Sequence, residues 1–188
     1  RMLVLDEADQ MLDLGFIHAL RKIVGYLPAK RQTLLFSATM PKQMTEIADA
    51  YLDRPIKVQV SPPGKAADKV EQAVHFIPQG DKAKLLESYL LEHRDEAALV
   101  FSRTKHGAEK LYRLLEKWGF SVGSIHGNKS QNQRERTLAA FRSGELKVLV
   151  ATDVAARGLD IPLVRHVYNL DLPNVPENYI HRIGHTAR

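Results

Sequence analysis

Arg1-Met-Leu-Val-Leu-Asp-Glu-Ala-Asp9 is the stretch of this sequence that decides its fold. Met2 to Leu5 form a short apolar run, which is typical of a parallel strand covered on both faces, and acidic residues follow at once. Open α/β sheets bind ligands beyond the carboxyl ends of their strands, where Asp6 and Glu7 can hold Mg²⁺ or position a water molecule. Taken alone, Asp6, Glu7 and Asp9 are more simply explained as capping and charging the first turn of a helix that runs on through Met11 and Leu12.

The composition predicts a folded protein of the cytoplasm. Apolar residues make up 44% of the 188 residues, which is enough for a hydrophobic core. Lys and Arg outnumber Asp and Glu by 27 to 22, and the resulting net charge of +5 favours a polyanionic partner. The lack of cysteine excludes disulfides and thiolate zinc sites and fits a reducing compartment. No stretch has the length of a membrane span, so we expect no membrane partner.

The first third of the chain is predicted to form an α/β unit. Apolar spacing and breaker residues predict a helix at 14–27, a strand at 32–36, a helix at 41–52 and a strand at 56–60. The second strand ends in Ser37 and Thr39, so two hydroxyls would lie beside three carboxylates at one sheet edge. Such hydroxyls can cap a helix and hydrogen-bond a carboxylate at the same time.

Ser61-Pro-Pro-Gly-Lys-Ala-Ala-Asp68 interrupts this pattern and predicts a linker over residues 61–69. A first domain would then span residues 1–60 and a second would span 70–188. Beyond the linker, strand and helix patterns alternate with short connections, which indicates right-handed βαβ units and a parallel sheet flanked by helices. The expected strands are 71–77, 97–101, 121–125, 147–151 and 164–170, and the expected helices are 82–92, 106–118, one from 130 to about 143, and 176–181. Ser130 and Gln133 form a capping box for the third of these helices.

Polar residues recur where the strands of this second region end. Ser102 and Thr104 follow one strand, His126 and Gly127 another, and Thr152 with Asp153 a third, with Arg157-Gly-Leu-Asp160 shortly after. Several such positions on one edge indicate a groove for an extended polyanion, because hydroxyls and glycine-bearing backbone can approach phosphates closely.

The last predicted helix is basic. His181, Arg182, His185 and Arg188 lie near its end, and helical spacing places 181, 185 and 188 on one face. These groups can point together at a phosphate, although a solvated basic face is an equally simple reading.

Taken together, these motifs resemble those of the DEAD-box ATP-dependent RNA helicases, bacterial members above all. The resemblance rests on the order and spacing of Asp6-Glu-Ala-Asp9, Ser37-Ala-Thr39, Val100-Phe101, Gln131 with Arg134, Ala151-Thr-Asp-Val-Ala-Ala-Arg-Gly-Leu-Asp160, Asn169-Leu-Asp-Leu-Pro173 and His181-Arg-Ile-Gly. It covers essentially the whole chain and implies the end of a first RecA-like domain followed by most of a second.

The resemblance implies ATP and Mg²⁺ as cofactors and RNA as partner, bound through its backbone with little sequence specificity. Asp6 and Glu7 would be the Mg²⁺-binding and water-activating carboxylates. Asp9 would exchange hydrogen bonds with Ser37, Thr39 and His181, which with Arg188 complete the expected catalytic set. The expected nucleotide contacts are Gly158, Asp160, Arg182, His185 and Arg188. The expected RNA contacts are Gly127, Gln131, Arg134, Thr152 and Asp153.

The sequence departs from the family pattern in two places. The glycine-rich phosphate loop and the adenine-recognising glutamine motif do not occur in it. We therefore expect the chain to be a piece of a longer protein that lacks part of its first domain. By itself, this piece is expected to have no ATPase activity. His185 and Ala187 also stand where the family has arginine and glycine. Histidine is shorter than arginine and largely neutral near pH 7, so a full-length parent that carries His185 is expected to hydrolyse ATP slowly.

Two other functions remain open. One is a catalytically idle module that grips the RNA backbone without ATP. The other is a DNA helicase of the same superfamily, against which the combination of Ser37-Ala-Thr39 with His181-Arg-Ile-Gly argues.

Overall fold

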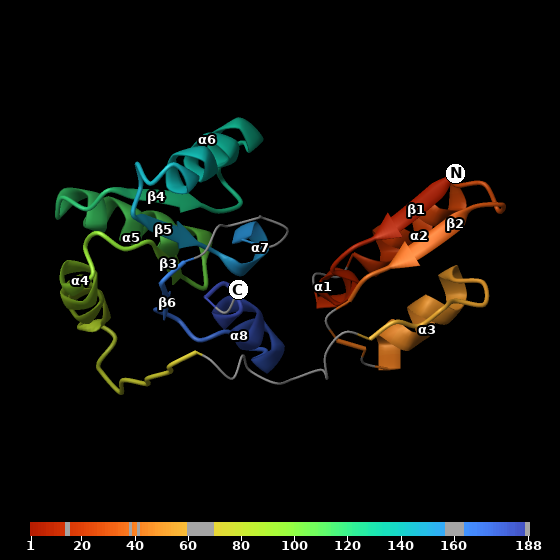
Figure 1. Cartoon of the computed structure of the whole chain (residues 1–188), viewed down its shortest axis with the longest axis horizontal. Helices are drawn as coiled ribbons and strands as arrows, with labels where there is room; N and C mark the ends of the chain where they lie inside the picture. Colours follow the sequence, from red (N-terminus) through yellow and green to blue (C-terminus); the bar gives the residue numbers. More distant parts are fainter. Residues whose placement is uncertain (14–15, 38, 41, 60–69, 157–163, 187–188) are drawn as a thin grey trace. The chain divides into compact units, whose positions relative to one another are not determined.

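The computed structural model describes residues 1–13, 16–37, 39–40, 42–59, 70–156 and 164–186 (Figure 1). The chain forms two compact units, residues 1–64 and 65–188. The predicted linker at 61–69 lies outside the described residues. None of the helices in the described part of the chain combines the length and the apolar character that crossing a bilayer requires.

The first unit contains two parallel strands, β1 (Met2–Leu5) and β2 (Gln32–Leu35), paired from Met2 with Gln32 to Leu5 with Leu35. Its helices are α1 (Ala8–Asp13), α2 (Ile17–Gly25) and α3 (Lys42–Tyr51). Their apolar faces cover one side of the strands, and the core consists of Leu5, Ala8, Leu20, Met44 and Ile47.

The prediction that the first strand is covered on both faces is wrong for the described residues. Side chains alternate across a strand, so Leu3 and Leu5 face the core while Met2 and Val4 face the other way. Met2 is 63% exposed and Val4 51%. An apolar run shows that a strand is hydrophobic on both faces, but whether each face is covered depends on elements that the run does not specify.

The second unit is a three-layer α/β domain with a four-stranded parallel sheet in the order β4-β5-β3-β6. The strands are β3 (Ala98–Phe101), β4 (Val122–Ile125), β5 (Val148–Ala151) and β6 (His166–Asn169). The helices are α4 (Lys82–Glu92), α5 (Lys105–Lys117), α6 (Gln131–Arg142), α7 (Asp153–Ala156) and α8 (Pro176–Ile183). The predicted α/β class with helix-flanked parallel strands is therefore confirmed.

Each face of this sheet has its own core. Leu86 of α4 and Leu111 and Leu115 of α5 pack on one face, whereas Leu138 and Phe141 of α6 pack on the other. The helix α6 approaches β4 so closely that a Cβ at Gly123 would lie 2.6 Å from Thr137 Cγ2. The predicted capping box at Ser130 and Gln133 is present at the start of α6.

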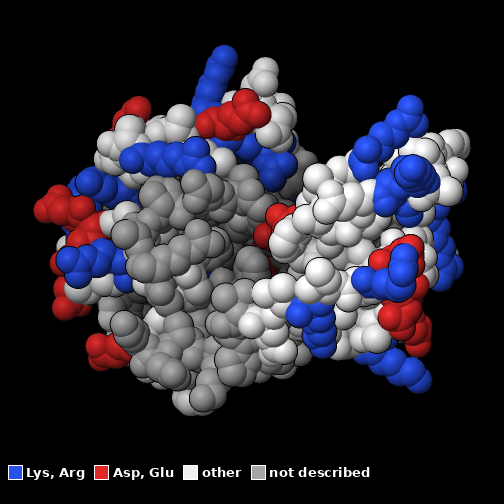
Figure 2. All heavy atoms as spheres, turned by 45° about the vertical axis from the view of Figure 1, so that its right-hand side comes forward, with Lys and Arg blue, Asp and Glu red and all other residues white. Residues whose placement is uncertain are grey.

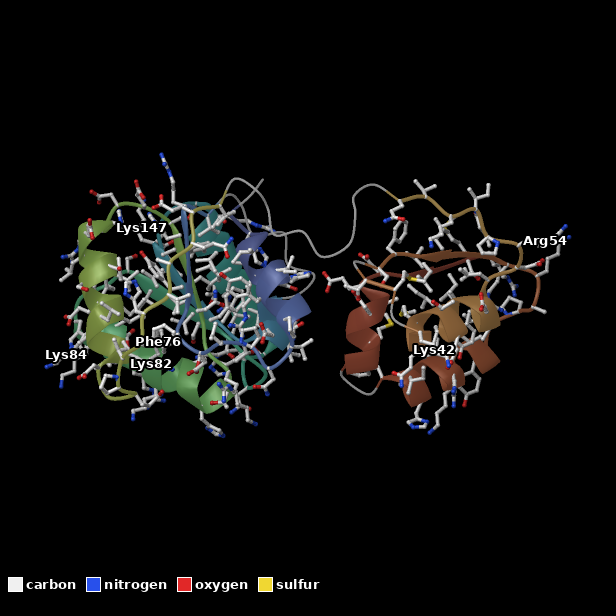
Figure 3. The ribbon with its side chains drawn as sticks, turned by 90° about the horizontal axis from the view of Figure 1, so that it is seen from below. Lys42, Arg54, Phe76, Lys82, Lys84 and Lys147 are labelled. Atoms are coloured by element: carbon white, nitrogen blue, oxygen red, sulfur yellow. The ribbon has the colours of Figure 1, made fainter. Side chains whose placement is uncertain are left out.

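Two predicted strands are wrong. Residues 56–59 and 71–77 have no strand structure, and Val60 lies outside the described residues. Ile56 is 92% exposed and Phe76 97%, and Figure 3 shows Phe76 on the extended segment before α4. Alternating apolar residues favour extended backbone, but a strand also needs a partner for its hydrogen-bond ladder, and none pairs with these segments in the described structure.

Candidate functional site

The acidic turn after β1 holds Asp6 and Glu7 in a specific geometry. Asp6 is exposed, and its Oδ1 accepts a hydrogen bond from the Glu7 backbone N–H at 2.9 Å. Glu7 has a φ of 50°, in the left-handed region that L side chains rarely adopt. Such strain of about 1 to 3 kcal/mol occurs mainly at functional sites, because the surrounding structure must hold it.

Asp9 joins the two strands of the first unit. Its buried carboxylate accepts from Thr39 through the backbone N–H at 2.8 Å and the hydroxyl at 2.9 Å, both on Oδ2. The Asp9 backbone N–H donates to Ser37 Oγ at 3.2 Å, and Ser37 Oγ donates to the Thr39 carbonyl. The proximity of Asp9 to both hydroxyls is thus confirmed, because in-register parallel strands end at the same edge.

Arg182 of α8 is a buried and multiply hydrogen-bonded side chain of the second unit. It is 1% exposed, and its Nε and Nη2 donate to the two carboxylate oxygens of Asp153 at 2.6 and 2.8 Å. Its Nη1 donates to Asn169 Oδ1 at 2.8 Å and to the Asp171 carbonyl at 2.7 Å. The guanidinium also lies over the Phe101 ring, 4.7 Å from its centroid. Arg182 therefore ties α8 to the ends of β3 and β6 and to the start of α7.

A small pocket lies beside this arginine. It is lined by Phe101, Asp153, Ala156, Asn178, His181, Arg182 and His185. The rings of His181 and His185 are 6.0 Å apart, edge to face, and His185 lies 6.1 Å from Phe101. The two histidines therefore share a side of the α8 region, as predicted, whereas Arg188 lies outside the described residues.

Asp171, within the motif Asn169-Leu-Asp-Leu-Pro173, is hydrogen-bonded to Arg103, Ser102 and Lys82, contacts that the sequence did not predict. Its carboxylate accepts from the Arg103 backbone at 3.1 Å, from Ser102 Oγ at 3.4 Å and from Lys82 Nζ at 3.3 Å. Burial acts to raise the pKa of Asp171, but the hydrogen bonds from Arg103 and Lys82 outweigh it and lower that pKa. The aspartate is thereby kept ionised beside the buried Ser102.

A second acidic centre is Glu109, which contacts His126 and Lys129 on either side of Gly127. Glu109 of α5 contacts the buried His126 Nε2 at 2.9 Å and Lys129 Nζ at 3.0 Å, and accepts from Arg113 at 3.2 Å. The His126 hydrogen bond is the largest contribution that lowers the pKa of Glu109 to about 2. His126 Nδ1 in turn accepts from the Asn128 backbone, which fixes the loop that contains Gly127.

The remaining predicted RNA contacts lie near one another in the chain fold. Thr152 is buried at the end of β5, and its backbone N–H donates to the Ile125 carbonyl at the end of β4. Arg134 donates to the Ala155 carbonyl at 3.2 Å, and its buried Nε has no hydrogen-bond partner among the described residues. Gln131 donates to Glu135 at 2.9 Å. Gly158 and Asp160, which were predicted to contact the nucleotide, lie outside the described residues.

Basic and acidic side chains are interspersed on the face drawn in Figure 2. Figure 2 shows Lys and Arg mixed with Asp and Glu on both units in that view. Figure 3 shows Lys84 pointing outward from α4, whereas Lys82 lies over the body of the second unit, where it contacts Asp171.

Both compact α/β units carry acids, hydroxyls or basic groups at the carboxyl ends of their parallel strands, where open α/β sheets bind ligands. The helicase conserved C-terminal domain matches residues 81–188, and the DEAD/DEAH box helicase domain matches residues 1–47. The chain belongs to the DEAD-box RNA helicase family.

Its relatives support this assignment. The chain is 46% identical over 184 residues to the RNA helicase CrhR of Synechocystis sp., covering 97% of this chain and 37% of that protein. It is 45% identical over 187 residues to the ATP-dependent RNA helicase RhlB of Shewanella sp., covering 98% of this chain and 43% of that protein. The chain therefore spans roughly two fifths of the length of these curated relatives.

Solved structures show the same fold. S. cerevisiae Dbp5 bound to RNA and ADP BeF3 matches with a TM-score of 0.84 and 32% identity, covering 100% of this chain and 50% of that one. A DEAD box protein from the hyperthermophile Methanococcus jannaschii matches with a TM-score of 0.62 and 36% identity, covering 100% of this chain and 50% of that one.

Proposed function

We propose that this chain is part of an ATP-dependent RNA helicase that binds RNA backbone and couples ATP hydrolysis to local duplex unwinding. The observation that carries the proposal is the junction of Asp9 with Ser37 and Thr39, directly beside the strained Asp6–Glu7 turn. This junction links the acidic turn of one strand to the hydroxyl motif of its neighbour. Nucleotide-dependent changes at one strand end can thereby reach the other.

Asp6 and Glu7 fit a Mg²⁺-assisted hydrolysis. Two carboxylates at a strand end are the oxygen donors that Mg²⁺ prefers, commonly through water. Bound Mg²⁺ would neutralise charge on the ATP phosphates. We assign Asp6 to the metal and Glu7 to accepting a proton from the attacking water.

The nucleotide contacts of the second unit are proposed for Gly158, Asp160, His185 and Arg188, with His181 paired to the acidic motif. For Arg182 and Asp153 the geometry favours a positioning role. Both guanidinium edges of Arg182 are already occupied by Asp153, Asn169 and the Asp171 carbonyl. We infer that this network holds α8, and with it His181 and His185, in place.

Gly127, Gln131, Arg134 and Thr152 are proposed to lie along the RNA backbone. Hydroxyl, amide and guanidinium donors suit phosphate and sugar contacts, which fix position without reading bases. Little sequence preference and a strong salt dependence are therefore expected.

The exposed face of β1 and β2 is proposed to pack against the rest of a first RecA-like domain. Met2 and Val4 of β1 are 63% and 51% exposed, and Phe36, which directly follows β2, is 52% exposed, whereas the helices cover the other side of both strands. Apolar side chains grouped in this way commonly mark an interaction surface. The relatives, being longer, have chain available for such a contact.

The test is a chimera in which the N-terminal part of the Shewanella relative precedes this chain. The chimera should show RNA-stimulated ATPase activity, and Glu7→Gln should abolish it while leaving the circular dichroism unchanged. The 188-residue chain alone should show no turnover. Activity that survives Glu7→Gln would sink the assignment.

The idle RNA-binding module makes a different prediction for the same chimera. Its RNA affinity should depend on salt but should be identical with and without a non-hydrolysable ATP analogue. Tighter RNA binding in the presence of the analogue favours the enzyme.

A further inference from the structure

Two imidazoles and a carboxylate meet at the amino end of the sheet in the second unit, away from the strand ends described above. His166 is the first residue of β6, and His93 and Glu96 lie between α4 and β3. Strands of a parallel sheet share one direction, so this cluster lies at the amino ends of the strands, whereas Ser102 and Thr152 lie at their carboxyl ends. It belongs to none of the nucleotide or RNA contacts proposed here.

The backbone already fixes the three positions. His93 caps α4, with its N–H donating to the Tyr89 carbonyl, and the Glu96 N–H donates to the His93 carbonyl at 3.0 Å. This turn places both side chains on one side. His166 pairs with Ala98, and its N–H donates to the Ala97 carbonyl, which sets it beside Glu96. Little ordering of the backbone is needed for the three groups to act together.

The side-chain atoms are close enough to share an ion. One nitrogen of each histidine and one Glu96 oxygen all lie within 4.8 Å of one another. His93 Nδ1 is 3.8 Å from Glu96 Oε2, and His166 Nε2 hydrogen-bonds the same oxygen. Ligands at about 2.0 to 2.2 Å from a tetrahedral ion lie roughly 3.3 Å apart, so small movements suffice. The stacked rings of His93 and His166 must tilt away from each other to converge on the ion.

We propose that His93, Glu96 and His166 form a Zn²⁺ site, with water completing the coordination. Two imidazoles with one carboxylate suit Zn²⁺ and related transition ions, whereas Mg²⁺ and Ca²⁺ prefer oxygen ligands alone. The side chains are 34%, 38% and 23% exposed, which leaves the ion an entry path. The ion would replace the proton between His166 and Glu96 and would tie the end of α4 to the edge strand β6.

One neighbouring group limits the affinity. Arg165 adjoins His166 in the chain and acts electrostatically on Glu96, so its positive charge opposes a divalent cation. Binding in the micromolar range is therefore expected rather than the tighter binding of closed structural zinc sites.

Isothermal titration of the chelator-treated 188-residue chain with ZnCl₂ tests this. The proposal expects one equivalent to bind saturably, and His166→Asn or Glu96→Gln to weaken it at least tenfold. His106→Gln, which changes an exposed histidine of α5, is the matched control and should bind as the parent does. Loss of binding in the control to the same extent, or no saturable equivalent in the parent, overturns the site.

A measurement on the unaltered chain guards against variants that misfold. Diethylpyrocarbonate modifies accessible histidines, and peptide mass spectrometry identifies which ones react. Zn²⁺ should protect His93 and His166 while leaving the modification of His106 unchanged. Equal protection of all three, or of none, overturns the proposal. Neither experiment uses nucleotide or RNA, so its outcome is independent of the helicase assignment.

Discussion

Replacing Arg182 by methionine tests the network that holds α8. Methionine has a similar length but no donors, so Arg182→Met removes four hydrogen bonds and leaves the Asp153 carboxylate without its partner. Breaking a buried ion pair from one side costs about 3 to 5 kcal/mol. Asp153 is 23% exposed, and water can solvate part of the stranded charge, so about 3 to 4 kcal/mol is expected.

The single tryptophan makes this loss measurable. Trp118 is the only tryptophan in the sequence and packs against the core of the second unit, so its fluorescence reports the unfolding of that unit. With an m-value of about 2 kcal/mol/M, the urea midpoint should fall by roughly 1.5 to 2 M. The exposed Arg136 of α6 provides the control, since Arg136→Met should change stability by less than about 0.5 kcal/mol.

A double variant separates the ion pair from the packing. The double variant Arg182→Met with Asp153→Leu should lose less free energy of unfolding than the sum of the two single losses. Each single variant leaves one unpaired charge, whereas the double variant removes both charges. The reasoning is refuted if Arg182→Met costs under about 1 kcal/mol, or if the two losses simply add.

Three further predictions concern the site, the acidic centre and the packing of α6. In the chimera, His185→Arg should raise the ATPase rate by at least tenfold, since arginines at transferring phosphates are worth roughly 10³ to 10⁵ in rate, and equal rates would contradict the proposed contact. The pKa of Glu109 is lowered from 4.5 to about 2 in the folded protein, so the ionised carboxylate stabilises the fold above pH 4.5, and this stabilisation is lost as the pH falls through about 2. Because Glu109 is partly exposed, about 2 kcal/mol of free energy of unfolding is expected to be lost. Urea midpoints at pH 5 and pH 2.5 should therefore differ less for Glu109→Gln than for the parent, and parallel losses would count against the Glu109 cluster. Gly123→Ala should destabilise the second unit by about 1 to 3 kcal/mol in the same urea assay, because the new Cβ would meet Thr137 and Leu146 at 2.6 and 2.7 Å; an unchanged midpoint would show that α6 can move aside.

The sequence predicted most of the second unit because its signals are local. The fully apolar strands β3 and β5, the helical spacing between strands and the capping box at Ser130 all act within a few residues. The placement of Asp9 near Ser37 and Thr39 was also predictable, although these residues are distant in the chain. Once two strands are known to be parallel neighbours, the residues that follow them must meet at one edge.

The two false strands have a common origin. Residues 56–59 and 71–77 carry the alternation of a strand, but they lack a neighbour to complete a ladder in the described structure. Pairing is a long-range property, since the partner lies elsewhere in the chain. Local pattern can favour extended backbone without deciding whether it joins a sheet.

The sequence by itself determined the class of fold, the order of its elements and the chemical groups at the strand ends, because these follow from periodicity and from residue type. Only the tertiary structure decided what those groups are bound to. It paired Arg182, a predicted nucleotide contact, with the Asp153 carboxylate, brought Asp171 to Ser102 and Lys82, and brought His166 to the turn that carries His93 and Glu96. Each of these contacts joins residues distant in the chain, and strand register and helix packing, which set such distances, are fixed only when the whole unit folds.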